Sequence, residues 1–136
     1  MGQVFTKHFV VSPQDLNHAG TLFGGTIMAH ADELAYIAAT LTFPGCTFVT
    51  KVFCEFNFVS GAVNGDIIKT EAEVLSKGRS SVKVAVRAIN AVTAREIFHT
   101  EAVLVNARSG KSIPIPELPP GTSAPGESCH DLSHCV

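Results

Sequence analysis

The chain has 136 residues, of which 46% are hydrophobic and 16% are charged, and its formal net charge is −2. This length fits one domain with a packed core, and the composition excludes disorder over most of the chain. It also argues against a nucleic-acid-binding protein, because such domains usually carry an excess of basic residues.

Membrane insertion and secretion are not expected either. No apolar stretch reaches the roughly 20 residues that span a bilayer. The start MGQVFTKHFVV has neither a basic head nor a small-residue cleavage site. We therefore expect a cytoplasmic protein without a membrane partner.

The predicted elements are one strand, one long helix and four further strands. Residues 4–11 are rich in Val and Phe and predict a strand, and residues 16–21 form a loop of turn-forming residues. A helix begins after Gly24 and Gly25 and ends at residues 43–45. Strands are expected at residues 49–59, 67–75, 81–89 and 97–105. Consecutive strands with short turns favour an antiparallel sheet, so the expected class is α+β, with one sheet wrapped around one helix.

Apolar residues recur three and four positions apart along the expected helix, and alanines fill much of the rest. This pattern predicts a helix that is buried on most of its sides. The recurring residues are Ile27, Ala31, Leu34, Ala38 and Leu41.

Asp32 stands in the middle of this apolar helix, where an aspartate has poor helix propensity and no cap to form. A buried carboxylate is costly unless it is paired or used. The residues expected on the same face are all uncharged: Gly25, Met28, Ala29, Tyr36 and Ala39. We therefore interpret Asp32 as a functional carboxylate, and Glu33 as a residue of the solvent face.

Gly24 and Gly25 open the helix. Adjacent glycines let another group approach the backbone closely, and the first turn of a helix has amide N–H groups without intrahelical partners. Together they favour a site for a negative charge or for a polarised carbonyl oxygen. The alternative is that the pair forms only a tight turn into a crowded helix.

A cluster of polar residues lies between the second and third of the four later strands. It consists of Lys77, Gly78, Arg79, Ser80 and Ser81. Such a turn could bind phosphate groups through its two cations and two hydroxyls. The alternative is an ordinary hairpin turn with solvated charges.

The composition changes after residue 112, where five prolines follow within a short span and cannot pair in a sheet or continue a helix. We expect a domain at residues 1–112 and a loosely ordered tail at 113–136. The tail contains Cys129-His130 and His134-Cys135. Because each Cys and His are adjacent rather than two to four residues apart, we expect no metal site there.

The order N-x-x-G-x-x-F-G-G followed by M-x-x-x-D resembles the acyl-CoA thioesterases of the hotdog superfamily, in particular the bacterial YciA type and the animal cytosolic acyl-CoA hydrolases. The matching residues are Asn17, Gly20, Phe23, Gly24, Gly25, Met28 and Asp32. Weaker similarity extends through Val49-Thr50, Gly65-Asp66 and residues 77–82. The resemblance covers roughly residues 5 to 107 and implies the hotdog fold, an antiparallel sheet around one long central helix.

The resemblance also implies the roles of single residues. Asp32 would act as general base or nucleophile, the amide of Gly24 or Gly25 would polarise the thioester carbonyl, and Asn17 would position water or substrate. Phe23, Thr50 and the turn at 77–81 are expected to contact the acyl-CoA substrate. A thioester is already activated, so we expect neither a metal nor a cofactor beyond the CoA of the substrate.

The expected site needs two chains. Gly25 and Asp32 are seven residues apart, about 10 Å along a helix that rises about 1.5 Å per residue. A donor must lie within about 3 Å of the carbonyl oxygen, so the aspartate of an antiparallel partner helix is better placed than the chain's own. The resemblance likewise implies a dimer or a dimer-based tetramer or hexamer.

Two other functions are compatible with this sequence. A hotdog hydratase or dehydratase acting on acyl-thioesters could pair His18 with an acidic residue of the helix. In those enzymes a Pro-Gly pair precedes the acid by about one helical turn, which the spacing of Gly25 and Asp32 does not match. An acyl-CoA-binding protein without catalytic activity would usually carry an attached DNA-binding segment, and this sequence shows none.

Overall fold

The structure is a computed structural model in which residues 2–117 are described. The elements follow in the order β1 (Val4–Val10), a 3-10 helix η1 (Pro13–Asp15), α1 (Gly24–Thr42), β2 (Phe48–Phe58), β3 (Ile67–Lys77), β4 (Ser81–Asn90), β5 (Glu96–Arg108) and β6 (Lys111–Ser112). The predicted strand, helix and four later strands are therefore confirmed, with ends that differ by up to three residues.

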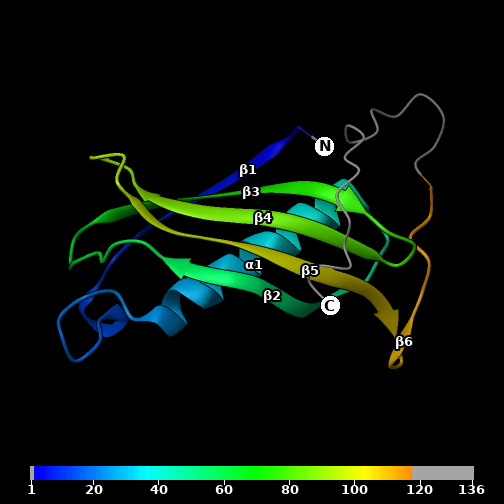
Figure 1. Ribbon diagram of the computed structural model, residues 1–136, viewed down its shortest axis with the longest axis horizontal. Helices are drawn as coiled ribbons and strands as arrows, with labels where there is room; N and C mark the ends of the chain where they lie inside the picture. Colours follow the sequence, from blue (N-terminus) through cyan, green and yellow to red (C-terminus); the bar gives the residue numbers. More distant parts are fainter. Residues whose placement is uncertain (1, 118–136) are drawn as a thin grey trace.

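The main sheet is antiparallel and has the strand order β1-β3-β4-β5-β2, with β6 paired to the end of β5. Three consecutive strands, β3 to β5, are neighbours, as short turns predict. β2 instead pairs with β5 at the far edge, so residues 59–66 carry the chain across to β3. Figure 1 shows the sheet curving around α1, which is the antiparallel arrangement of the hotdog fold.

One face of α1 packs against the sheet, and the opposite face is exposed in the single chain. The buried residues are Ile27, Ala31, Leu34, Ala35, Ala38 and Ala39. Alanines at the contact allow helix and sheet to approach closely, and each buried aliphatic side chain stabilises the fold by about 2 kcal/mol. On the other face Met28, Tyr36 and Leu41 are exposed. The expectation of a helix buried on most sides is therefore wrong for one chain alone.

Asn106 of β5 joins the start of β2, the β3–β4 turn and the segment after β6. The Asn106 side chain is buried. It accepts a hydrogen bond from the Thr47 N–H (2.9 Å) and donates one to the Pro114 carbonyl (3.5 Å). Its backbone N–H donates to the Ser80 carbonyl (2.8 Å). This end of the sheet is thus held together by Asn106, whose side-chain and backbone amides connect β5 with three other segments.

The chain continues along the sheet beyond residue 112. The Ile113 N–H donates to the Asn106 carbonyl and the Ile115 N–H to the Arg79 carbonyl, both at 2.8 Å. The Ile115 side chain belongs to the hydrophobic core, with 5% of its surface exposed. Residues 113–115 are therefore docked, although the sequence placed them in the tail.

Some sequence expectations lie outside the described residues, among them the possible ligands Cys129, His130, His134 and Cys135. Within residues 2–117, no group of three or more His, Cys, Asp and Glu side chains is arranged to hold a metal ion. No helix in that same range is long and apolar enough to cross a membrane.

Candidate active site

Helix α1 begins at Gly24 without a side-chain cap, since Phe23 occupies the N-cap position. The Thr26 and Ile27 amides both donate to the Phe23 carbonyl, at 3.0 and 3.2 Å. The amides of Gly24 and Gly25 precede them and have no acceptor within the helix. Two N–H donors therefore stand at the positive end of the helix dipole, where they can bind an oxygen with negative charge.

An aromatic ring explains why position 25 is glycine, and a second ring lies at ordinary contact distance from position 24. A Cβ at Gly24 would lie 3.4 Å from the Phe58 ring, and one at Gly25 would lie 2.6 Å from the Phe23 ring. The second distance is too short unless the ring moves. Crowding at the helix start, the alternative given for the glycine pair, is therefore present within the chain itself, while the approach of a substrate group stays a prediction; Phe23 and Phe58, each about half exposed, line the helix start.

Asn17 organises the loop that leads to the helix. Its Oδ1 accepts hydrogen bonds from the amides of Ala19 (2.9 Å) and Thr21 (3.1 Å), and its Nδ2 donates to Thr21 Oγ1 (3.0 Å). The loop is further tied to residues 59–66 by the Leu22 N–H, which donates to the Ala62 carbonyl (2.8 Å). Asn17 therefore has a structural role in addition to the substrate role that the resemblance implies.

Asp32 lies on the exposed face of α1, two turns after the glycine pair. Thr50 of β2 donates a hydrogen bond from Oγ1 to Asp32 Oδ1. Gly25, Met28, Ala29 and Tyr36 are exposed like Asp32, but Ala39 is buried against the sheet. The predicted face is therefore correct except for Ala39, and one chain alone does not provide apolar surroundings for the carboxylate.

The neighbours of Asp32 along the helix have other partners. Glu33 forms an ion pair with Lys7 of β1, and this hydrogen bond and positive charge lower the pKa of Glu33. The His30 ring stacks on Phe9, with ring centroids 3.7 Å apart. Burial, and after it the charge of Lys7, lowers the pKa of His30. These contacts point toward β1, which makes Glu33 and His30 poor candidates for chemistry at Asp32.

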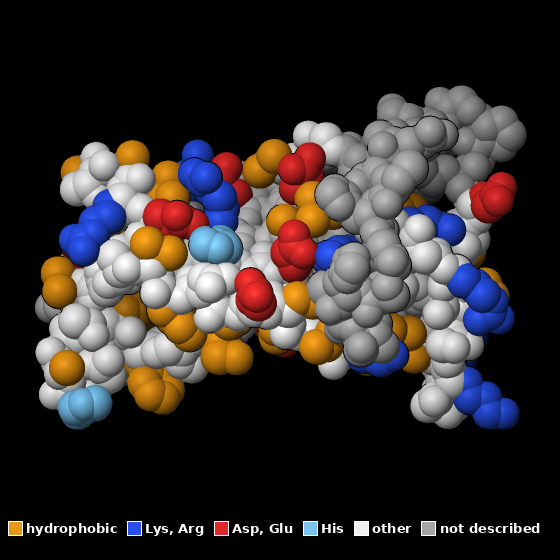
Figure 2. Space-filling model, viewed as in Figure 1, with side chains coloured by type: hydrophobic (Ala, Val, Ile, Leu, Met, Phe, Trp, Pro, Cys, Tyr) orange, Lys and Arg blue, Asp and Glu red, His pale blue; other side chains and the backbone are white. Residues whose placement is uncertain are grey.

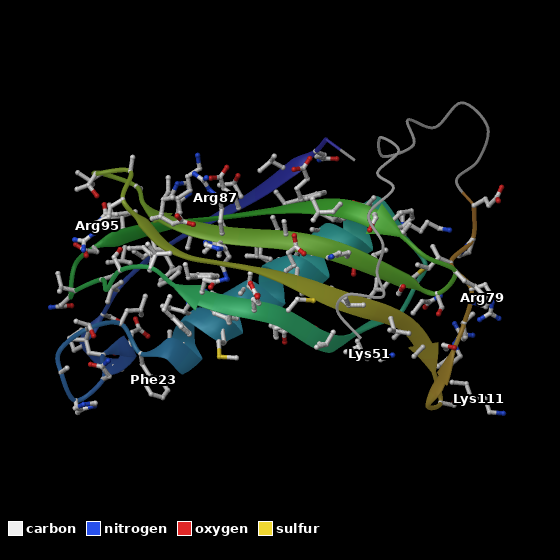
Figure 3. The ribbon with its side chains drawn as sticks, viewed as in Figure 1. Phe23, Lys51, Arg79, Arg87, Arg95 and Lys111 are labelled. Atoms are coloured by element: carbon white, nitrogen blue, oxygen red, sulfur yellow. The ribbon has the colours of Figure 1, made fainter. Side chains whose placement is uncertain are left out.

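The β3–β4 turn at residues 77–81 is not brought near the helix start of the same chain. Figure 3 shows Arg79 at one end of the long axis and Phe23 toward the other. The Gly78 N–H donates to the Ser81 carbonyl at 2.8 Å, which closes the turn. A contact between this turn and the substrate therefore requires either a substrate that extends far from the helix start or a turn that serves the site of a second chain.

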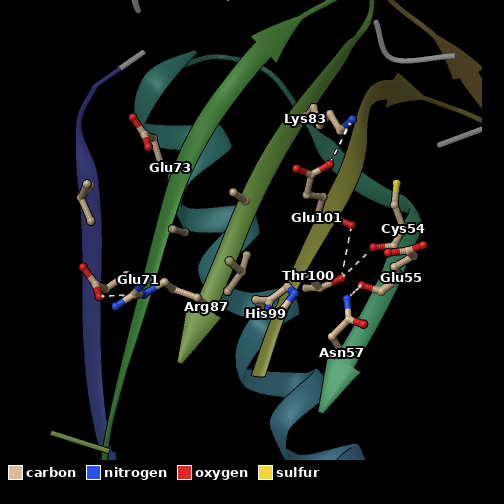
Figure 4. A pocket seen from close by; sticks show the side chains of 14 residues that line it. Cys54, Glu55, Asn57, Glu71, Glu73, Lys83, Arg87, His99, Thr100 and Glu101 are labelled. Carbon is tan, nitrogen blue, oxygen red and sulfur yellow. Dashed lines mark hydrogen bonds and ion pairs between the residues drawn. The ribbon is translucent and has the colours of Figure 1, made fainter. Parts of the chain in front are cut away.

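A cavity of about 830 Å³ lies on the other face of the sheet, away from α1 (Figure 4). Its charged side chains pair across neighbouring strands: Lys83 Nζ lies 3.1 Å from Glu101 Oε1, and Arg87 Nε lies 3.5 Å from Glu71 Oε1. These residues alternate with core residues along the strands, so they point away from the helix. None of the predicted catalytic residues lines this cavity.

Two features of the site were not predicted from the sequence. Thr50 was expected near the substrate, but its hydrogen bond to Asp32 depends on the bulged pairing of β2 with β5, a contact between distant segments. Phe58 was not singled out, although the aromatic run Phe53, Phe56 and Phe58 indicates a cluster at the end of β2. The site thus combines a carboxylate, an orienting hydroxyl, two free amides and exposed aromatic rings.

This geometry can be compared with known proteins. The family model of the "Thioesterase superfamily" matches residues 19–96. An uncharacterized acyl-CoA thioester hydrolase of Bacillus subtilis (strain 168), YkhA, is 32% identical over 117 residues, which is 82% of this chain and 67% of the relative.

Solved structures agree with these sequence matches. A hexameric acyl-CoA thioesterase superposes with a TM-score of 0.75 at 31% identity, covering 88% of this chain and 80% of the other. An acyl-CoA hydrolase of Staphylococcus aureus, in complex with butyryl coenzyme A, coenzyme A and coenzyme A disulfide, superposes with a TM-score of 0.74 at 32% identity, covering 83% and 69%. Variants of the same hydrolase have an aspartate, an asparagine or a threonine replaced by alanine.

Proposed function

Because this chain belongs to the thioesterase superfamily, we propose that it hydrolyses acyl-CoA thioesters to the free acid and CoA. The observation that carries the proposal is the helix start, where the Gly24 and Gly25 amides are uncapped on the same exposed side of α1 as Asp32. Uncapped amides suit the oxyanion that forms when a thioester carbonyl is attacked.

The reaction needs one proton acceptor and one oxyanion site. Asp32 takes a proton from water, the water oxygen bonds to the carbonyl carbon, and the amide of Gly24 or Gly25 stabilises the carbonyl oxygen. The carbon–sulfur bond then breaks, and the CoA thiolate leaves and is protonated. Attack by Asp32 itself, followed by hydrolysis of the resulting anhydride, uses the same residues. In both routes the Thr50 hydroxyl holds Asp32 in place.

The variants of the Staphylococcus aureus hydrolase support this choice of residues. The residue types replaced in that enzyme, an aspartate, an asparagine and a threonine, are those of Asp32, Asn17 and Thr50. Phe23 and Phe58 flank the glycines and are suited to contact the acyl chain. We also propose that the β3–β4 turn contacts CoA through Lys77, Gly78, Arg79, Ser80 and Ser81.

The active site would be shared between two chains. In a single chain, α1 exposes Met28, Tyr36 and Leu41. The edge strand β2 exposes Val49, the residue before Thr50. An antiparallel partner helix across a two-fold axis covers this apolar face and brings the partner's Asp32 opposite Gly25. The hexameric state of a similar thioesterase supports self-association; the number of chains stays a prediction, as does the cytoplasmic location.

The first test is a direct assay of the purified chain with a panel of acyl-CoAs and a thiol reagent. Free CoA should appear at the rate at which acid is formed. Asp32→Asn should lose at least roughly 10²-fold in kcat, the usual contribution of an acid–base group. Glu33→Gln is the matched control, because it removes the neighbouring carboxylate, which pairs with Lys7.

Each outcome of this assay decides between functions. Full activity of a folded Asp32→Asn protein would contradict the mechanism. Hydration of an enoyl-CoA without release of thiol would favour a hydratase, and tight binding of acyl-CoA without turnover would favour a binding protein.

The shared site is tested by subunit complementation. Asn17→Ala and Asp32→Ala proteins should each be nearly inactive. After they are unfolded and refolded together, about half of the dimers are mixed, and each mixed dimer has one intact site of two. Roughly a quarter of the wild-type activity should return. If mixed dimers form but no activity returns, the site lies within one chain.

A further inference from the structure

The pairing of β2 with β5 is interrupted near the end of β2 by a β-bulge. Cys54 is opposite Glu101. Asn57, three residues further along β2, is opposite His99, which is only two residues away from Glu101 in β5. Glu55 lies in this interval and has a left-handed backbone conformation, with φ of 48°. Glycine is the usual residue at left-handed positions of bulges, because a side chain is disfavoured there.

The extra residue changes which side chains of β2 face the helix. Side chains alternate between the two faces of a sheet, so residues 53, 55 and 57 of a regular strand would share one face. Phe56 instead follows Phe53 on the face that packs against the core, and their ring centroids are 5.7 Å apart. Glu55 and Asn57 line the cavity on the other face (Figure 4). The bulge therefore turns Phe56 and Phe58 toward α1.

Phe56, Phe58 and Phe98 form a continuous line of rings, which we call the aromatic row. The centroid of the Phe56 ring lies 4.9 Å from that of Phe58 and 5.0 Å from that of Phe98. Phe98 of β5 is 1% exposed, whereas Phe58 is 53% exposed. The row thus runs from the core to the surface. Its exposed end reaches the helix start, where a Cβ at Gly24 would lie 3.4 Å from the Phe58 ring.

The exposed end of the aromatic row is suited to an acyl chain. A carbonyl oxygen bound by the Gly24 or Gly25 amide lies within about 3 Å of the donor. The carbon chain attached to that carbonyl then begins beside Phe58. Hydrophobic side chains also gather along the edge of the molecule that β2 and the first part of α1 form (Figure 2). Contact between CH2 groups and an aromatic face favours longer chains over acetyl.

We propose that Glu55 is a positioning residue for acyl-chain selection: its left-handed backbone directs Phe58 to the helix start, and the Phe58 ring contacts the carbon chain of the substrate. The Glu55 side chain is exposed, and its carboxylate takes part in none of the ion pairs among residues 2–117. Its backbone conformation, rather than its charge, therefore carries the role. This inference rests on the proposed thioesterase function and adds a residue that selects the substrate.

The first test measures chain selection as the ratio of kcat/KM for hexanoyl-CoA to kcat/KM for acetyl-CoA. Phe58→Ala should lower this ratio roughly tenfold, the usual effect of losing apolar contact in a pocket. Glu55→Val should lower the same ratio, since a β-branched residue strongly disfavours a left-handed backbone. Glu55→Gly adopts that conformation freely and should keep the wild-type ratio.

Two control variants separate chain selection from charge and from stability. Glu55→Gln removes the charge and should keep the wild-type ratio. Ser109→Val places a β-branched residue at another left-handed position, with φ of 53°, in the β5–β6 turn. It should lower the melting temperature without changing the ratio. A ratio that falls equally in Glu55→Gly and Glu55→Val, or falls in Glu55→Gln, would overturn the role of the backbone conformation.

A double variant tests whether Glu55 acts through Phe58. Glu55→Val combined with Phe58→Ala should give the same ratio as Phe58→Ala alone, because the ring to be positioned is absent. Additive losses would show that Glu55 does not act through Phe58. If Glu55→Val does not fold, Glu55→Thr makes the same comparison with a polar β-branched residue. If both fail to fold while Ser109→Val folds, the bulge serves the fold as a whole and the role in selection is overturned.

Nuclear magnetic resonance gives a readout that needs no turnover. One Hα of Gly24 takes the place of a side chain and points at the Phe58 ring, so the ring should shift its resonance. Phe58→Ala should abolish this shift, Glu55→Gly should keep it and Glu55→Val should reduce it. An unchanged resonance in Glu55→Val would mean that the conformation of Glu55 does not position Phe58.

These outcomes separate the inference from the function on which it rests. If the wild type hydrolyses neither thioester, the proposed function fails, and the Gly24 resonance still decides whether Glu55 positions Phe58. If both thioesters are hydrolysed but Phe58→Ala and Glu55→Val leave the ratio unchanged, only the inference fails.

Discussion

Asp32 and Glu33 are adjacent carboxylates on α1 in two different environments. Glu33 is paired with Lys7, whose hydrogen bond and charge lower the pKa of Glu33. Asp32 instead receives its hydrogen bond from the neutral hydroxyl of Thr50. A hydroxyl orients a carboxylate without neutralising it, whereas a lysine makes it a weaker base. This difference supports the proposed role of Asp32, rather than Glu33, in proton transfer.

Replacement of Thr50 tests the orienting role. Thr50→Val keeps the shape of the side chain and removes the hydroxyl, so kcat should fall roughly tenfold, in line with one lost hydrogen bond to a charged group. Thr50→Ser should retain most of the activity. Steady-state kinetics with matched melting curves check this, and a Thr50→Val enzyme with unchanged kcat would show that the hydroxyl is dispensable.

His30 makes part of the stability depend on pH. Its pKa in the folded state is lowered, first by burial and then by Lys7, while Glu33 and Asp15 oppose the shift. The unfolded chain therefore binds a proton at higher pH than the folded chain. The contribution of His30 is fully present above the ordinary histidine pKa of about 6.5 and is lost as the pH falls toward the folded-state value.

The matched variant for this prediction is His30→Phe, which keeps an aromatic ring on Phe9 and cannot titrate. Urea unfolding between about pH 8 and pH 5 should show a smaller loss of stability for the variant than for the wild type. Parallel curves for the two proteins would mean that other groups cause the pH dependence.

At the level of elements, local patterns predicted almost everything that depends on neighbouring residues. The alternation of Val82, Val84 and Val86 predicts the buried face of β4, and the glycine pair predicts the start of α1. The pairing of β2 with β5, the contact of Thr50 with Asp32 and the docking of Ile115 join residues that are far apart in sequence. The hydrophobic periodicity within one segment does not predict contacts between distant segments.

Two truncations test where the folded domain ends. A chain that stops after Pro116 keeps Ile115, so its free energy of unfolding should be close to that of the full chain. A chain that stops after Ser112 loses the buried Ile115 and the hydrogen bonds to Asn106 and Arg79. It should be less stable by about 3 kcal/mol, the usual cost of emptying a buried aliphatic site.

Denaturant unfolding measures both truncations. Equal stability of the two shortened chains would support a domain boundary at residue 112. A large loss after truncation at Pro116 would instead show that later residues contribute to the fold.

At the scale of the whole molecule, the exposed apolar face of α1 implies a specific pairing of chains. Suppose that Gly25 lies beside Asp32 of the partner subunit in an antiparallel pair. Each residue further along one helix is then paired with the residue one position earlier on the partner helix. Met28 then lies beside Ala29 of the partner subunit, so these two residues surround the two-fold axis. Both are exposed in the single chain, as a contact between copies requires.

Ala29→Glu should therefore separate the chains. The variant places two carboxylates near each other at the axis, where like charges and their desolvation oppose association. Sedimentation should show a smaller assembly, and hydrolysis should fall with it if the active site is shared between two chains as proposed. Val92→Glu, at a turn residue with 79% exposure, should leave the assembly intact. An Ala29→Glu protein of unchanged mass would place the interface elsewhere.

The uncapped start of α1 has a consequence for the end of the reaction. A serine or aspartate at the N-cap position would stabilise a helix by about 1 kcal/mol, but Phe23 stands there and leaves two amides open. We expect a bound ligand to take the place of the cap. The acid released by hydrolysis is an anion, and anions bind a helix N-terminus better than the neutral carbonyl of the substrate does. Free carboxylic acids should therefore inhibit this enzyme competitively, and turnover should slow as the acid accumulates and competes with substrate for the helix start.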